Sequence, residues 1–484
     1  MGNHAIAIPQ ADVVFEIFKQ LNQIPRPSHH EERVADFLCK YAERLGLEYD
    51  RDDHNCVVIR KPATPGYERC TPIVLLNHMD MVCVGMNDPL NDPIEAYTED
   101  GWMKARGTSL GADNGIGLSM ALAVLADDRI VHGPLEVMTT TNEEDGMSGA
   151  ANLSEDFLCG RKVINLDSED YDTITTGAAG AYLQLHRLPV TWQPAPKGKY
   201  RWYRISITGG HGGHSGVDIN KGRASAVVLS WAVLAAIYNE YDFDLASIRV
   251  GEANASIASS AEMVICVPSG EAAEFVKSQE QSLNEWIANE YGATDPNVRC
   301  HIEKTEPRER IMNRKAMEAL LTALEQIPQG VVKMSEQMEG TVETSNNVGR
   351  IVTEDNHLLI STHTRSFIDD DMVALGKEIR DVFASQGATS ELVMSAPAWQ
   401  ENQNSDFLRL TSDVFEDVLG WRPRPVAMHF VLEAGYFVQK YPGIEIASIG
   451  PRIVEPHSVN ERVELSTIND IWRVLIVLLH VLAG

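Results

Sequence analysis

PIVLLNH at Pro72–His78, DNGIGLSMALAVL at Asp113–Leu125, LEVMTTT at Leu135–Thr141 and KVINLD at Lys162–Asp167 decide the fold of this chain. The three short runs are typical of strands that are buried on both faces of a parallel sheet. The long run is apolar almost all round, which predicts a helix enclosed by the fold. The order strand, helix, strand and strand predicts an α/β layered domain.

Signals for buried elements continue on both sides of this stretch. Ser28 and Glu31 match a capping box, which predicts a helix from there to about Leu45. IEIASIG at Ile444–Gly450 indicates another buried strand. The closing segment Ile471–Gly484 is apolar but too short to span a bilayer, so we expect a final helix packed on the sheet.

Two breaks in composition divide the chain. The pattern changes near residue 188, and WQPAPKGKY at Trp192–Tyr200 is rich in Pro, Gly and Lys. SAPAWQENQNSD at Ser395–Asp406 marks a second break. We therefore predict one domain made of residues 1–188 and 392–484, with residues 189–391 inserted between its two parts.

Composition narrows the function classes. Hydrophobic residues make up 44% of the chain, which is enough for a large core. The net charge of −28 disfavours nucleic acid and membrane partners, because an acidic surface repels phosphate groups. The 7 cysteines contain no CxxC pair, which fits a reducing compartment. The start, MGNHAIAIPQ, lacks a signal-peptide pattern, so we expect a cytoplasmic protein.

Acidic and imidazole groups fall at the ends of the predicted strands. His78 ends one strand and Asp80 lies two residues on, Glu143 and Glu144 follow the next strand, and Asp167 ends the third. Open α/β sheets place their ligand sites just beyond the carboxyl ends of the strands. We therefore expect these side chains to converge at one edge of the sheet.

Two further residues extend this group. Asp113 opens the apolar helix, where the helix dipole favours a carboxylate, and His457 lies in a loop that follows a strand. Taken singly, such residues are more often turn formers, caps or packing residues than ligands. Together, two imidazoles and three carboxylates form a ligand set suited to zinc, manganese or cobalt.

Signatures of other enzyme classes are missing from the sequence. His30-Glu31-Glu32-Arg33 is followed by Val34, so there is no HExxH zinc motif. Gly213–Val217 resembles a nucleophile elbow but lacks the G-x-S-x-G spacing. Gly111, Gly115 and Gly117 do not form GxGxxG, and there is no phosphate-binding GK[ST] loop.

Seven motifs occur in a specific order over almost the full chain. They are NHMDMV (Asn77–Val82), KARGTSLGADNGIG (Lys104–Gly117), NEEDGMSGA (Asn142–Ala150), INLDSED (Ile164–Asp170), GGHSG (Gly212–Gly216), VETSNNVG (Val342–Gly349) and IGPRIVEPHS (Ile449–Ser458). This set resembles the aminoacyl-histidine dipeptidases (Xaa-His dipeptidase, peptidase D), a subgroup of the dinuclear-zinc metallopeptidase family that includes carnosinases and aminoacylases. RKPAT at Arg60–Thr64 and LADDRIVHGPLEV at Leu125–Val137 narrow the resemblance to this subgroup.

The resemblance implies an architecture and a metal centre. A catalytic α/β domain would have a mostly parallel sheet flanked by helices, and an inserted α+β lid domain would form a homodimer. Two divalent ions, zinc with cobalt or manganese as substitutes, would be bound. His78 and Asp167 would hold one ion, Glu144 and His457 would hold the other, and Asp113 would bridge both.

The resemblance also implies the remaining roles. Glu143 would be the general base, Asp80 would support His78, and His214 would reach the substrate carbonyl. The substrate-binding residues would be Arg365, Asn254 and Gly435, the last in a VLEAG stretch where the family has a GLE-C-G-like sequence.

The implied reaction is hydrolysis of dipeptides, specifically Xaa-His dipeptides of the carnosine type, by a water shared between the two metals. Two alternatives stay open: an aminoacylase or tripeptidase with the same chemistry, and a non-catalytic scaffold stabilised by metal. Glu143 argues against the scaffold, since none of the metal sites needs a second Glu beside Glu144.

Overall fold

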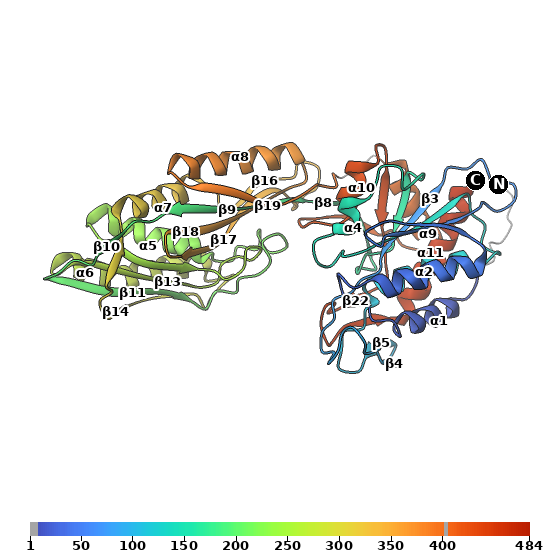
Figure 1. Ribbon diagram of the computed structural model, residues 1–484, viewed down its shortest axis with the longest axis horizontal. Coiled ribbons are helices and arrows are strands. Elements are labelled where there is room, and N and C mark those ends of the chain that lie inside the picture. The colour runs from blue at the N-terminus through green and yellow to red at the C-terminus, as the bar shows by residue number, and fades with distance from the viewer. Residues whose placement is uncertain (1–7, 401–404) are drawn as a thin grey trace. The chain divides into compact units, whose positions relative to one another are not determined.

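The computed structural model describes residues 8–400 and 405–484, and its chain divides into two compact units (Figure 1). The first unit takes the described parts of Met1–Gly177 and Glu401–Ala427 together with Glu433–Gly484. The second unit takes Ala178–Gln400 and the short segment Met428–Leu432. The sequence pattern did not predict that this short segment would group with the second unit.

The large sheet of the first unit has eight strands in the order β1-β2-β6-β3-β7-β21-β8-β20. Its centre is parallel, since β3 runs parallel to β6 and β7, and β21 runs parallel to β7. Antiparallel strands flank this centre on both sides. The strands are β1 (Glu48–Arg51), β2 (Val57–Lys61), β3 (Ile73–His78), β6 (Leu135–Thr140), β7 (Lys162–Asn165), β8 (Thr173–Ala178), β20 (Arg424–Met428) and β21 (Glu445–Ser448).

Helices cover this sheet, as the apolar runs predicted. Every residue of β3 and β6 is buried, and α3 (Ala112–Ala126) is buried from Ala112 to Leu125. The α/β prediction for this part of the chain is therefore confirmed. The other helices of the unit are α1 (Asp12–Leu21), α2 (Glu32–Leu45), α4 (Ser148–Asn152), α9 (Asp406–Leu419), α10 (Ala434–Lys440) and α11 (Leu465–Ala483).

The closing helix is longer than the sequence suggested. α11 begins at Leu465 rather than near Ile471, and it is long and apolar enough to cross a membrane by length and composition. Half of its most apolar window is buried inside the protein, where it packs against α9. Burial of this kind is typical of a core helix.

A small sheet completes the first unit. It has the order β22-β23-β5-β4, and β23 pairs antiparallel with both β22 and β5. Its strands are β4 (Ala96–Glu99), β5 (Trp102–Ala105), β22 (Ile453–Val454) and β23 (Arg462–Glu464).

The second unit is an α+β layer built on one sheet, with a core of its own (Figure 1). The sheet order is β14-β11-β13-β12-β17-β18-β9-β19, with β16 paired to β17, and all neighbouring strands in this sheet are antiparallel. A separate two-stranded sheet pairs β10 with β15, and β15 contacts β12 of the main sheet. The strands are β9 (Gly180–Pro189), β10 (Trp192–Pro194), β11 (Tyr200–Thr208), β12 (Asp244–Val250), β13 (Ala261–Pro268), β14 (Arg299–Lys304), β15 (Arg310–Met312), β16 (Gly330–Met334), β17 (Val342–Thr353), β18 (His357–Ser366) and β19 (Thr389–Ala396); the helices are α5 (Ala226–Glu240), α6 (Glu271–Tyr291), α7 (Arg314–Gln326) and α8 (Asp369–Ser385).

The predicted capping box at Ser28 is wrong. Helix α2 begins at Glu32 without a side-chain cap. The Ser28 hydroxyl instead donates to Asp80 Oδ2 at 2.8 Å, and Glu31 Oε1 accepts the backbone N–H of Asn142 at 2.8 Å. Both side chains therefore bind residues of other loops at the edge of the sheet. These tertiary hydrogen bonds replace the local capping bonds that the motif predicted.

Candidate metal centre and active site

The imidazole of His78 is the meeting point of the acidic residues in the first unit. It ends β3 and is buried. Its Nε2 atom lies 3.1 Å from a carboxylate oxygen of Asp113 and 3.1 Å from one of Asp167. Burial alone would lower the pKa of His78, but these two carboxylates raise that pKa well above its ordinary value.

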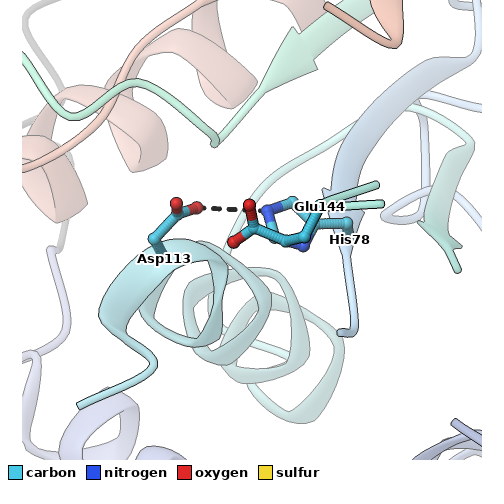
Figure 2. A group of neighbouring side chains, drawn as sticks. All are labelled: His78, Asp113 and Glu144. Carbon is cyan, nitrogen blue, oxygen red and sulfur yellow. Dashed lines mark hydrogen bonds and ion pairs between the residues drawn. The ribbon is translucent and has the colours of Figure 1, made fainter. Parts of the chain in front are cut away.

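Asp113 connects His78 to a second imidazole, that of His457. Its Oδ1 atom faces His78, and its Oδ2 atom lies 3.0 Å from His457 Nε2. The same nitrogen lies 3.0 Å from Glu144 Oε2. Hydrogen bonds to Asp113 and Glu144 raise the pKa of His457 to about 11. Figure 2 shows Asp113 at the start of its helix, facing His78 and Glu144.

A carboxylate that the sequence reasoning missed lies in the same cluster. Ligand atoms of Asp113, Glu169 and His457 all lie within 4.8 Å of one another, as do those of His78, Asp113 and Glu144. Burial, followed by the charge of Asp113, raises the pKa of Glu169 to about 8. The signal in the sequence was its position two residues after Asp167.

The cluster fits divalent cations. Four carboxylates and two imidazoles gather here, and Glu144 Oε1 is buried without a hydrogen-bond partner among the described residues. Buried carboxylates that face one another are costly unless a cation balances them. Oxygen and imidazole donors of this kind suit zinc, manganese or cobalt.

Asp80 holds the loop that follows β6. Its carboxylate accepts the backbone N–H of Glu143 at 3.0 Å and that of Glu144 at 3.2 Å. Its Oδ1 atom lies 3.5 Å from His78 Nδ1, whereas its carbonyl oxygen is closer, at 3.2 Å. Asp80 therefore lies beside His78, where its support of that imidazole stays a prediction, and its carboxylate also holds the backbone of both glutamates.

Glu143 lies next to these groups with a raised pKa. Burial is the main cause, and the negative charges of Asp167 and Glu433 act in the same direction against the opposing charge of His78. A carboxylate with a raised pKa is a stronger base than an ordinary exposed carboxylate. Its environment therefore suits a general base.

The VLEAG stretch places a buried carboxyl group in the first unit. Glu433 Oε2 accepts a hydrogen bond from the Thr140 hydroxyl at 2.6 Å, and burial raises the pKa of Glu433 to about 8. Gly435 follows within α10 and is also buried. No feature of the sequence marked Glu433 as a buried group beside the cluster.

Arg365 of β18 is the buried cation of the second unit. Its side chain is 3% exposed, and Nη2 lies 3.5 Å from the Ser215 hydroxyl. Its Nε atom has no hydrogen-bond partner within the part of the chain that the structure describes. Burial lowers the pKa of Arg365 to about 10, which still leaves the guanidinium charged at neutral pH.

His214 and Asn254 belong to neighbouring loops of the second unit. His214 bridges to Ser256, and the Ser215 N–H donates to the carbonyl of Ala255 at 2.8 Å. The backbone N–H groups of Gly216 and Val217 donate to His214 Nδ1 at 3.2 and 3.1 Å. A neutral His214 therefore carries its proton on Nε2.

Two buried histidines near Arg365 were not predicted. His363 lies two residues before Arg365 on the same face of β18, and neither ring nitrogen has a hydrogen-bond partner among the described residues. His429 shares a 2.8 Å hydrogen bond with the Ser345 hydroxyl through Nε2. Burial, with the charge of Arg365, lowers the pKa of both imidazoles. The alternation of His363 and Arg365 in the sequence was the available signal.

Comparisons with known proteins show relatives that match almost the full length of this chain. The cytosol non-specific dipeptidase of Escherichia coli (strain K12) is 34% identical over 470 residues, which cover 96% of this chain and 96% of that protein. The crystal structure of aminoacylhistidine dipeptidase from Vibrio alginolyticus matches with a TM-score of 0.91 and 33% identity, over 99% of this chain and 98% of that one.

A more distant structure shares the fold alone. Aminopeptidase PepT from Bacillus cereus ATCC 10987 matches with a TM-score of 0.62 and 18% identity, over 99% of this chain and 100% of that one. A family model described as peptidase family M20/M25/M40 matches residues 74–482. This chain belongs to peptidase family M20/M25/M40.

Proposed function

We propose that this chain is a metal-dependent dipeptidase. The observation that carries the proposal is the carboxylate of Asp113, which faces His78 with one oxygen and His457 with the other. The charge of the same His78 acts on the buried carboxyl group of Glu143. The names of the Escherichia coli and Vibrio alginolyticus relatives support a dipeptide substrate. Among dipeptides, we propose Xaa-His substrates of the carnosine type.

In this proposal the acidic cluster would hold two divalent ions. His78 and Asp167 would hold one ion, Glu144 and His457 would hold the other, and Asp113 would bridge both; zinc is the proposed ion, with cobalt or manganese as substitutes. When bound, such ions lower the pKa of water and polarise a peptide carbonyl.

The protein's own groups move the proton and orient the substrate. Glu143 takes a proton from the attacking water and delivers it to the leaving amine nitrogen. Asp80 keeps Glu143 in place through the backbone N–H bond described above. His214 donates from Nε2 to the oxyanion that develops on the substrate carbonyl.

The second unit selects the length of the substrate. Arg365 binds the free carboxylate through a forked pair of N–H donors, and Asn254 contacts the substrate backbone. Gly435 of the first unit is a further proposed substrate-binding residue. A carboxylate held at a fixed point selects a peptide bond one residue away from it. We further propose a cytoplasmic homodimer without nucleic acid or membrane partners; the net charge of −28 supports the last two points.

A substrate panel tests this proposal. Protein stripped of metal and supplied with zinc, manganese or cobalt is assayed on carnosine, Gly-His, other dipeptides, tripeptides and N-acyl amino acids. Cleavage that favours a C-terminal His supports the full proposal. Preferred cleavage of tripeptides or N-acyl amino acids would replace the substrate class, and no cleavage with any metal bound would favour a scaffold.

A further inference from the structure

Glu461 accepts an unusual number of backbone hydrogen bonds in the first unit. Its side chain is 3% exposed. One carboxylate oxygen accepts the N–H groups of Leu110 at 2.7 Å and Gly111 at 3.0 Å. The other oxygen accepts the N–H groups of Ala112 at 2.8 Å and Asp113 at 3.4 Å.

These four donors belong to the turn that carries Asp113. They lie where α3 begins, so none of them has a partner within the helix. Asp113 and Asn114 also depart from helical torsions, with φ −82° and ψ 112° at Asp113. The Arg26 guanidinium also contacts this turn, where Nη2 donates to the carbonyl of Gly111 at 2.7 Å. The shape of the turn therefore depends on side chains from distant parts of the chain.

Glu461 also belongs to the loop that carries His457. Its backbone N–H donates to the carbonyl of Ser458 at 3.2 Å, and the next residue begins β23. Within this loop His457 has a positive φ of 56°, a conformation that depends on support from its surroundings. The Glu461 carboxylate thus links the loop of His457 to the turn of Asp113. In the cluster, His457 Nε2 and Asp113 Oδ2 lie 3.0 Å apart.

We propose that Glu461 is a positioning residue for the metal centre, because it sets the separation of Asp113 and His457. This inference rests on the metal sites of the proposed function. It is independent of the substrate, and metal binding can be measured without one. Partners that orient metal ligands typically contribute about 10- to 100-fold to metal affinity or activity.

Glu136 provides a matched control in the same unit. Glu136 is 4% exposed, and its carboxylate accepts the backbone N–H groups of Cys159 and Gly160, at 3.0 and 2.7 Å for Oε2. It lies near the start of β6, whereas the cluster lies beyond the end of that strand. Its replacement therefore removes buried backbone hydrogen bonds without touching the turn of Asp113.

The experiment compares Glu461→Gln with Glu136→Gln in the full-length chain. Each protein is stripped of metal and titrated with zinc against a competing chelator, without substrate, and its thermal unfolding is followed by circular dichroism. In Glu461→Gln one amide oxygen replaces two carboxylate oxygens, and the amide NH2 group faces backbone donors. We expect both variants to unfold at lower temperature, and only Glu461→Gln to bind one zinc equivalent about 10- to 100-fold more weakly.

A purely structural role for Glu461 predicts a different result. The proposal is overturned if Glu461→Gln binds two zinc equivalents with the wild-type affinity, or if Glu136→Gln weakens zinc binding as much. If Glu461→Gln does not fold, Glu461→Asp is titrated in its place. This variant keeps both carboxylate oxygens but moves them back by one methylene, so wild-type zinc affinity in Glu461→Asp would also overturn the proposal. Failure of the wild-type protein to cleave dipeptides would refute the proposed function and leave the affinity comparison intact.

Discussion

The two units bury groups of opposite charge around their candidate sites. The first unit collects carboxylates from the ends of several strands around His78, and burial raises the pKa of Glu143, Glu169 and Glu433. The second unit collects imidazoles around Arg365, and burial lowers their pKa values. Bound cations would stabilise a buried cluster of carboxylates, whereas a bound anion would stabilise a buried guanidinium whose Nε atom has no partner among the described residues.

This contrast in buried charge supports the proposed division of roles between the two units. The acids of the first unit suit metal ions and the transfer of a proton. The basic groups of the second unit suit the carboxylate of a peptide. Removal of an acid from the first unit should therefore lower turnover, whereas removal of a basic group from the second unit should weaken substrate recognition. The buried groups of the two units should also make stability depend on pH in opposite directions.

Removal of the proposed base should have the largest effect. Glu143→Ala is expected to lower kcat by about 10²- to 10⁴-fold, the range for lost general-base catalysis, because the proposed acceptor of the proton of the attacking water is then missing. Metal content should stay at the wild-type value. Asp145→Asn is the control, since Asp145 is an exposed acid of the same loop that pairs with His29. Near-normal turnover of Glu143→Ala would show that Glu143 is not the general base.

Removal of the buried guanidinium should affect recognition instead. Arg365→Ala is expected to lower kcat/KM for dipeptides roughly 10- to 100-fold, since a hydrogen bond to a charged group contributes about 1.5–3 kcal/mol. The loss should appear mainly in KM. Arg187→Ala, in the same sheet but exposed and paired with Glu391, should leave the kinetics unchanged.

Dipeptide amides sharpen this test, because they lack the free carboxylate. Arg365→Ala should cleave them as fast as the wild type does, so the preference for a free carboxylate should disappear. An equal loss on dipeptides and on their amides would mean that Arg365 supports the fold and does not bind the substrate.

The buried acid Glu433 should make the metal-free protein less stable at high pH. Burial raises its pKa from 4.5 to about 8, so the folded state holds a proton that the unfolded state has lost. Its contribution to stability is complete below pH 4.5 and is lost as the pH rises to about 8. In chelator, the wild-type Tm should therefore fall between pH 5 and 8, by about 2–4 °C for each kcal/mol lost. The side chain in Glu433→Gln cannot ionise, so the Tm of this variant should fall less over the same pH range. A decline as steep as that of the wild type would contradict this assignment.

His186 should give the opposite and smaller dependence in the second unit. Burial lowers its pKa from 6.5 to about 4, and its ring nitrogens lie 2.8 and 2.9 Å from the hydroxyls of Ser390 and Thr362. Its contribution is present above pH 6.5 and is lost as the pH falls to about 4. The Tm should therefore drop with acid in the wild type, and less steeply in His186→Gln. Parallel slopes in the two proteins would contradict the assignment.

The sequence predicted the core of the site because local patterns and sheet topology agree there. Parallel strands share one carboxyl edge, so residues that follow β3, β6 and β7 had to meet. The roles given to His78, Asp113, Glu144, Asp167 and His457 follow from that convergence and from the family resemblance.

The groups that the sequence did not reveal depend on distant packing. Glu461 precedes an Arg-Val-Glu strand and has the local appearance of a surface acid, yet its partners lie about 350 residues earlier in the chain. Ser28 and Glu31 matched a local motif but bind Asp80 and Asn142 instead. Burial of this kind becomes visible only when the chain is folded.

The most direct test of the central claim is a stoichiometric titration. Metal-stripped protein is titrated with zinc while hydrolysis of a dipeptide is followed, and bound zinc is counted at each step. We expect no hydrolysis without metal and a rise to a plateau at two ions per chain, with both binding and hydrolysis impaired in Asp113→Asn. Full hydrolysis by the stripped protein, or none with two ions bound, would contradict the central claim.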